Sequence, residues 1–134
     1  MKSLLLCFLL VPAFIYCQEE SKHPIDISLA ECMEKDYSTH GMLQCLNEAA
    51  EKWDAELNKV YNELKGMLDD SGKKKLKEAQ QEWIKFRDKE FEFLDYLYSQ
   101  KDGTMYLTMR AADRVEVVRK RALELQSYID VLKY

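Results

Sequence analysis

The stretch KWDAELNKVYNEL, residues Lys52 to Leu64, decides the fold of this chain. Its apolar side chains recur at steps of four, three and four residues, as Trp53, Leu57, Val60 and Leu64. Side chains at that spacing share one face of an α-helix, so the stretch predicts a helix with one buried stripe. The alternation continues in both directions, from a cap at Thr39 to Met67, before the turn-forming residues 69–72 end it.

Three more helices are predicted on either side of this stretch. Ser28 and Glu31 have the spacing of a capping box and predict a short helix to about Asp36. A third helix begins at or just before Lys73 and carries the stripe Leu76, Ala79, Trp83, Phe86, Glu90, Leu94 and Leu97. A fourth follows Thr104, with the stripe Ala111, Val115, Val118, Ala122, Leu125, Ile129 and Leu132. No segment alternates like a strand, so we expect an all-α, up-down-up bundle of three long helices.

The N-terminus has the pattern of an export signal. Lys2 precedes an apolar run from Leu4 to Ile15, which has the length of a signal-peptide core and is too short to span a bilayer. We expect a signal peptide over residues 1–17, a flexible arm over 18–27 and one helical domain over 28–134. Acylation at Cys17 is the less favoured alternative, because bulky Tyr16 precedes it. The chain is therefore expected to be exported, periplasmic or secreted, with no transmembrane segment.

Cys32 and Cys45 remain after removal of this leader. Exported cysteine pairs meet an oxidising compartment, where they most often form a disulfide. The bridge would tie the short first helix to the bundle. Two buried free thiols are the alternative.

Polar Asp54, Asn58 and Tyr61 lie beside the stripe of the opening stretch. In two antiparallel helices joined by a turn near Ser71, facing residue numbers have a constant sum. That register pairs Asp54 with Arg87, Asn58 with Trp83 and Tyr61 with Gln80. We expect these six residues to form a structural polar seam that fixes helix pairing. A catalytic role is disfavoured, because the set lacks a nucleophile and a base with a near-neutral pKa.

Three runs carry a resemblance to a known family: THGMLQC (39–45), WDAELNKVYNEL (53–64) and LKEAQQEWIKFRDKEF (76–91). They resemble the LprI-like lysozyme-inhibitor family of exported bacterial proteins, in which a cysteine precedes Asp-x-x-Leu-Asn-x-x-Tyr and then Ala-Gln-x-x-Trp-x-x-x-Arg-Asp-x-x-Cys. The positions that match in order and spacing are Cys45, Asp54, Leu57, Asn58, Tyr61, Ala79, Gln80, Trp83, Arg87 and Asp88. Arg121 and Leu125 are similar to its closing Arg-x-x-x-Leu, so the likeness covers about residues 31–126.

One departure from the family pattern stands at Phe91, which occupies the place of the last cysteine. No cysteine occurs near Asp113, where its partner would lie. The second family disulfide is therefore expected to be absent and replaced by apolar packing.

Catalytic, cofactor and metal sites are not expected from the sequence. The only histidines are His23 and His40, and neither follows a glutamate at the spacing of a helical di-metal site. The net charge of −4 argues against a nucleic-acid partner.

The aromatic residues Phe91, Phe93, Tyr96 and Tyr98 surround the end of the third helix and are candidate partner-binding residues. Cover by the short first helix is the alternative that makes them core. The resemblance implies a protein partner, a lysozyme-type glycosidase, bound by a monomer or weak dimer. A non-inhibitory envelope adaptor or chaperone-like helical module is the alternative function, and an enzyme is disfavoured for want of a site.

Overall fold

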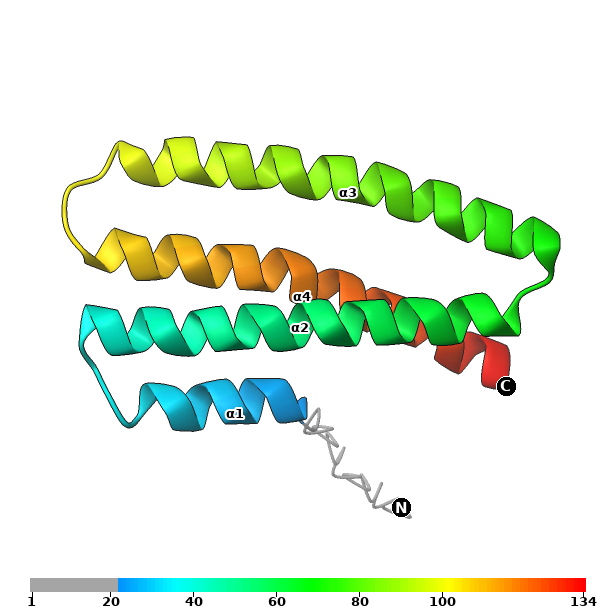
Figure 1. Cartoon of the computed structure of the whole chain (residues 1–134), viewed down its shortest axis with the longest axis horizontal. Coiled ribbons are helices and arrows are strands. Elements are labelled where there is room, and N and C mark those ends of the chain that lie inside the picture. Colours follow the sequence, from blue (N-terminus) through cyan, green and yellow to red (C-terminus); the bar gives the residue numbers. More distant parts are fainter. Residues whose placement is uncertain (1–21) are drawn as a thin grey trace, which may run out of the picture.

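The computed structural model describes residues 22–134 and contains four α-helices in that range. They are α1 (Pro24–Met33), α2 (Thr39–Met67), α3 (Asp70–Ser99) and α4 (Met105–Lys133). Helices α2 and α4 run in the same direction and lie side by side, and α3 runs in the opposite direction beside α4, which confirms the all-α, up-down-up bundle (Figure 1). The expected signal peptide, together with residues 18–21 of the expected arm, lies outside the described residues.

Helix α1 begins earlier than the sequence suggested. His23 is its N-cap, with ring Nδ1 accepting the backbone N–H of Ile25 at 3.3 Å, and Pro24 occupies the first turn. Proline suits that position because its φ is already helical and its missing N–H would have no helical acceptor. The expectation of a flexible arm is therefore wrong for residues 24–27, and Ser28 lies inside the helix.

Short polar side chains cap the next two helices. Ser38, one residue before the expected Thr39, accepts the N–H of Gly41 at 3.0 Å through its hydroxyl. Asp69 accepts the N–H of Gly72 at 2.7 Å, so α3 begins at Asp70, just before Lys73 as predicted. These bonds satisfy backbone donors that the first helical turn leaves free.

The core lies between α2 and α4, with α1 packed against it. Its members are Leu46, Ala49, Trp53, Leu57, Val60, Leu64, Val115, Val118, Ala122, Leu125 and Ile129. Helix α2 packs along the whole of α4, whereas α3 packs mainly against α4 and touches α2 little. Leu94 is the one buried residue of α3. The long helices are thus a tight α2–α4 pair with α3 more loosely attached.

Helix α1 is fixed to the pair by the predicted disulfide. Cys32 and Cys45 are bonded, with their Cα atoms 5.7 Å apart, which confirms the pairing expected from the sequence. The bridge joins the last turn of α1 to the second turn of α2. We call this end of the molecule, where α3 also ends and α4 begins, the disulfide end (Figure 1).

Candidate functional site

The predicted polar seam between α2 and α3 is not formed. Asp54 accepts a hydrogen bond from Asn58 of its own helix, with Nδ2 to Oδ2 at 3.2 Å. Arg87 donates from Nε and Nη2 to its neighbour Asp88 at 3.0 and 2.7 Å. The predicted Asp54–Arg87 ion pair is therefore wrong, because α2 packs against α4 rather than against α3.

The other seam residues also have partners different from those predicted. Gln80 accepts a hydrogen bond from Nε of Arg121 on α4 at 3.0 Å instead of meeting Tyr61. Trp83 has the guanidinium carbons of Arg87 and Arg121 at 5.7 and 5.9 Å from its ring centre, so it makes cation–π contacts in place of a bond to Asn58. Tyr61 packs against the α2–α4 core. The two contacts with Arg121 join α3 to α4.

Asp54 and Arg87 nevertheless line one groove. It has a volume of 480 Å³ and lies between the first half of α2, the second half of α3 and the first half of α4. Its apolar lining is Leu43, Leu46, Ala50, Phe91, Leu107, Ala111, Val115 and Val118. Its polar lining is Asn47, Asp54, Arg87, Arg110 and Arg114. The groove exists because α3 does not close onto α2.

Three arginines gather around Phe91 and the mouth of the groove. The guanidinium carbons of Arg114 and Arg87 lie 4.9 and 6.0 Å from the Phe91 ring centre. Arg114 Nη2 and Arg110 Nη1 lie 2.5 and 3.5 Å from the two carboxylate oxygens of Asp95 on α3. Nε of Arg114 is buried and has no hydrogen-bond partner. Phe91, which stands where the family pattern has cysteine, is thus packed beneath arginines and against the core.

The four candidate aromatic residues divide into two pairs. The side chains of Phe93 and Tyr96 are exposed, at 54% and 65% of their full area. Phe91 lines the groove, and Tyr98 donates a hydrogen bond to Asp113 of α4, which raises the pKa of the Tyr98 phenol. Helix α1 lies on the other side of α2 from α3 and covers none of them (Figure 1).

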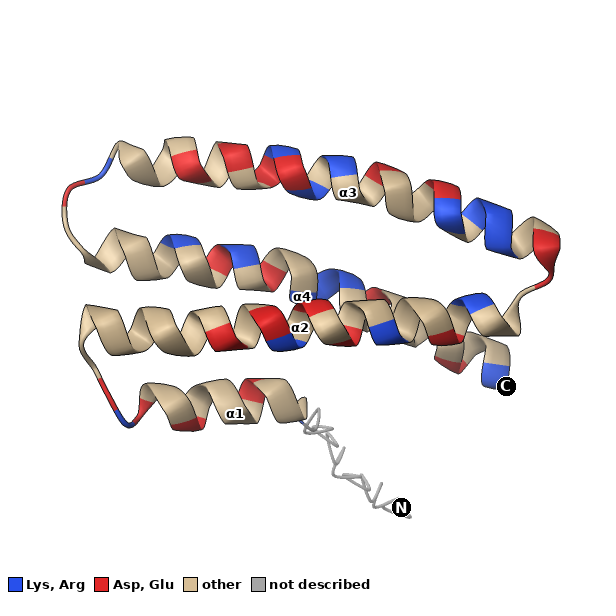
Figure 2. Ribbon diagram, in the orientation of Figure 1, with Lys and Arg blue, Asp and Glu red and all other residues tan. Residues whose placement is uncertain are grey.

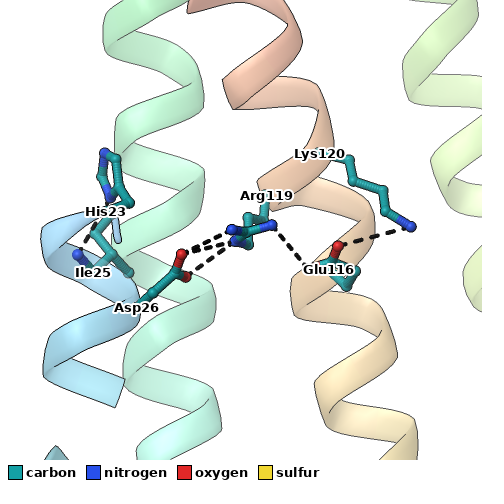
Figure 3. A network of polar contacts seen from close by, with 6 residues as sticks. All are labelled: His23, Ile25, Asp26, Glu116, Arg119 and Lys120. Carbon is teal, nitrogen blue, oxygen red and sulfur yellow. Dashed lines mark hydrogen bonds and ion pairs between the residues drawn. The ribbon is translucent and has the colours of Figure 1, made fainter. Parts of the chain in front are cut away.

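A network at Arg119 was not found from the sequence. Arg119 of α4 donates from Nε and Nη2 to the carboxylate of Asp26 on α1, at 2.9–3.1 Å, and from Nη1 to Glu116 at 3.5 Å (Figure 3). The hydrogen bonding to Asp26 raises the pKa of Arg119. The ring centre of Trp53 lies 5.6 Å from the guanidinium carbon of Arg119. The ring centre of His23 lies 4.4 Å from the ring centre of Trp53. The network fixes the start of α1 over the buried tryptophan.

Residues 22–134 contain no candidate metal site, because no three His, Cys, Asp or Glu side chains come close enough together to hold an ion. The same residues include no helix with the length and apolarity needed to cross a membrane. The groove and the exposed part of α3 both have the character of binding surfaces.

Comparison with known proteins places these features in a family. The model of the family described as lysozyme inhibitor LprI matches residues 30–125. The crystal structure of an uncharacterised protein from Burkholderia thailandensis is similar, with a TM-score of 0.77 and 30% sequence identity over 84% of this chain. This chain spans 56% of that longer protein. No curated protein sequence matches the chain. Since this family model covers most of the sequence, the chain belongs to the LprI lysozyme inhibitor family.

Proposed function

We propose that this protein is an exported inhibitor that binds a lysozyme-type glycosidase outside the cytoplasm. The observation that carries the proposal is the family match over residues 30–125, which includes all of α2 and α3, most of α4 and the end of α1. The leader-like residues 1–17 and the Cys32–Cys45 disulfide agree with an oxidising, extracytoplasmic location.

The contact surface that we assign to this function is the exposed side of α3 near the disulfide end. Phe86, Phe93, Tyr96 and Leu97 are all large side chains exposed by 40% or more on this one helix. Exposed aromatic residues are enriched among the side chains that dominate binding energy at protein interfaces. Because α3 hardly takes part in the core, its outer side can contact a partner without disturbing the α2–α4 pair.

The charge of the protein suits a cationic enzyme. The net charge is −4, and although α3 carries both acidic and basic residues, its last ten residues, 90–99, carry only acidic ones (Figure 2). Complementary charge steers diffusing partners together and raises the association rate, an effect that falls with ionic strength. Lysozyme-type enzymes are often cationic, so association should be faster at low salt.

The test uses the mature, disulfide-bonded protein with lysozymes of several types. Inhibition is measured as the rate of cell-wall lysis, and binding as retention on immobilised enzyme. We expect Tyr96→Ala and Phe93→Ala each to weaken binding about tenfold or more, as interface hot spots do. Both variants should keep the melting temperature, because their side chains are exposed.

Tyr134→Ala is the matched control, since Tyr134 is fully exposed at the opposite end of the molecule. It should bind like the unmodified protein. Binding without any slowing of lysis would contradict inhibition and favour the adaptor function. Failure to bind lysozymes of any type would contradict the proposal altogether.

A further inference from the structure

We propose that the groove between α2, α3 and α4 binds a single-chain amphiphilic carboxylate, such as a long-chain fatty acid, separately from any contact with lysozyme. Ligand pockets in proteins combine a mostly apolar lining with a few polar groups that fix orientation. This groove has eight apolar lining residues and a group of arginines at its mouth. The inference concerns a small-molecule site and does not depend on the inhibitor function.

The floor of the groove is suited to an alkyl chain. Seven of its lining side chains are aliphatic, contributed by α2 and α4, and Phe91 is the one aromatic ring. Backbone N–H and C=O groups along the floor are hydrogen-bonded to one another within the helices, so they are not free to bind a sugar or a nucleotide. Each methylene removed from water into such a lining contributes favourably to binding.

The arginines supply the complement to a negative headgroup. Arg87, Arg110 and Arg114 line the groove against one acidic lining residue, Asp54, although the whole chain is acidic. Arg110 and Arg114 already hold the carboxylate of Asp95, which shows that their geometry accepts this group. The Arg114 Nε and Asp95 Oδ1 atoms are buried without hydrogen-bond partners, so a ligand in the groove would not reach them. The side chain of Arg110 is 40% exposed and its Nη1 lies 3.5 Å from Asp95, so its guanidinium can donate a charge-assisted hydrogen bond to a second carboxylate at the mouth.

The size of the groove selects this class of ligand. One turn of an α-helix occupies roughly 400–600 Å³ from its pitch and diameter, so 480 Å³ holds about a single turn. A docked peptide helix would therefore be mostly outside the groove. Asp54, Asp88 and Asp95 balance the charges of the three arginines, so the groove accommodates a monoanion more easily than a doubly charged phosphate.

The experiment titrates the mature protein with sodium dodecanoate below its micelle concentration, followed by calorimetry. Dodecyltrimethylammonium tests the sign of the charge, hexanoate tests the chain length, and dodecyl phosphate tests the headgroup. We expect saturable one-to-one binding of dodecanoate and at least tenfold weaker binding of each of the other three. Equal binding of the cationic analogue, or tighter binding of the phosphate, would overturn the assignment.

Two groove variants test the location. Arg110→Gln removes a partly exposed cation while leaving Arg114 on Asp95, and Ala50→Phe fills the floor. Both should weaken dodecanoate binding about tenfold or more, by loss of a charged hydrogen bond or of space. Lys120→Gln, which removes one positive charge from the exposed side of α4, should leave it unchanged. Circular dichroism checks that both groove variants are folded. If both then bind dodecanoate with unaltered affinity, the site is refuted. Selective binding of an acidic amphipathic peptide in place of dodecanoate would also refute it.

Discussion

Arg119 of α4 donates hydrogen bonds from two guanidinium nitrogens to the carboxylate of Asp26 on α1, 93 residues away in the sequence. Both side chains are partly shielded from water, with 31% and 22% of their area exposed. We expect Asp26→Asn and Arg119→Gln each to lower the free energy of unfolding by about 1–3 kcal/mol, because each leaves a charged group without its partner. Chemical denaturation of the two variants measures this. In the double variant the loss should be smaller than the sum of the single losses, and simple additivity would contradict the pairing.

The Cys32–Cys45 bridge closes a short loop, with a sequence separation of 13. On the chain-entropy model its removal should cost about 3 kcal/mol, since the reduced unfolded chain regains freedom. Denaturation of the oxidised protein and of Cys32→Ser/Cys45→Ser measures the difference. A thiol assay on native, unreduced protein should find no reactive cysteine among residues 18–134.

The two tryptophans should differ sharply in their effect on stability. Trp53 is fully buried and its indole N–H has no hydrogen-bond partner, whereas Trp83 is half-buried on α3. Trp53→Ala should cost about 3–5 kcal/mol through the cavity it leaves, and Trp53→Phe much less, because no hydrogen bond is lost. Trp83→Ala should cost less than Trp53→Ala. Urea denaturation of the three variants tests the order, and a larger loss at Trp83 would show that α3 contributes more to the core than its burial indicates.

The stability of the α3–α4 side should respond to acid through Glu124. Hydrogen bonds from Arg121, and then from Tyr128, lower the pKa of Glu124 below its ordinary value of 4.5. A depressed folded-state pKa means that the carboxylate stabilises the fold above about pH 4.5, and that this contribution is lost as the pH falls through the lowered value. The melting temperature of Glu124→Gln should therefore lie below that of the unmodified protein at neutral pH and approach it in strong acid. A constant gap at every pH would contradict this coupling.

Helix α3 should open more readily than the helices it accompanies. Leu94 is its only buried residue, while α2 and α4 share the core. Segments with few buried apolar contacts open with a smaller free energy than the global unfolding. Hydrogen exchange followed by mass spectrometry should show earlier deuteration of residues 75–95 than of 50–64 or 115–129. Equal protection of all three segments would contradict the loose attachment of α3.

The sequence specified the helices well because their signals are local. Helix signals act over a few positions, as in the stripe through Trp53, Leu57 and Val60 and in the turn residues at 69–72 and 102–103. The disulfide could be predicted because only two cysteines remain after the leader and an exported protein meets an oxidising compartment. The start of α1 was missed because the capping-box spacing of Ser28 was given more weight than Pro24, whose preference for the first helical turn is equally local.

Helix pairing could not be deduced in the same way. The register that paired Asp54 with Arg87 assumes that helices adjacent in sequence pack together, yet α2 packs mainly against α4 and only slightly against α3. The apolar stripe of α3 offered a hint, since Glu90 interrupts it and Phe86 and Leu97 on it are exposed. Contacts between distant segments, such as Asp26 with Arg119, have no spacing that reveals them. The groove follows from this pairing and was equally hidden.

The parallel alignment of α2 with α4 also governs how fast the chain can reach its fold. Thr39 contacts Thr104, 65 residues away, and Glu63 contacts Lys133, 70 residues away, so the core forms only after a large loop closes. Folding rates fall as contacting residues lie further apart in sequence. An ordinary helical hairpin from α2 and α3 would not bury Trp53, so we expect docking of α4 to set the folding rate. Replacement of Leu125 should then slow refolding, while replacement of Phe93 should leave the refolding rate almost unchanged.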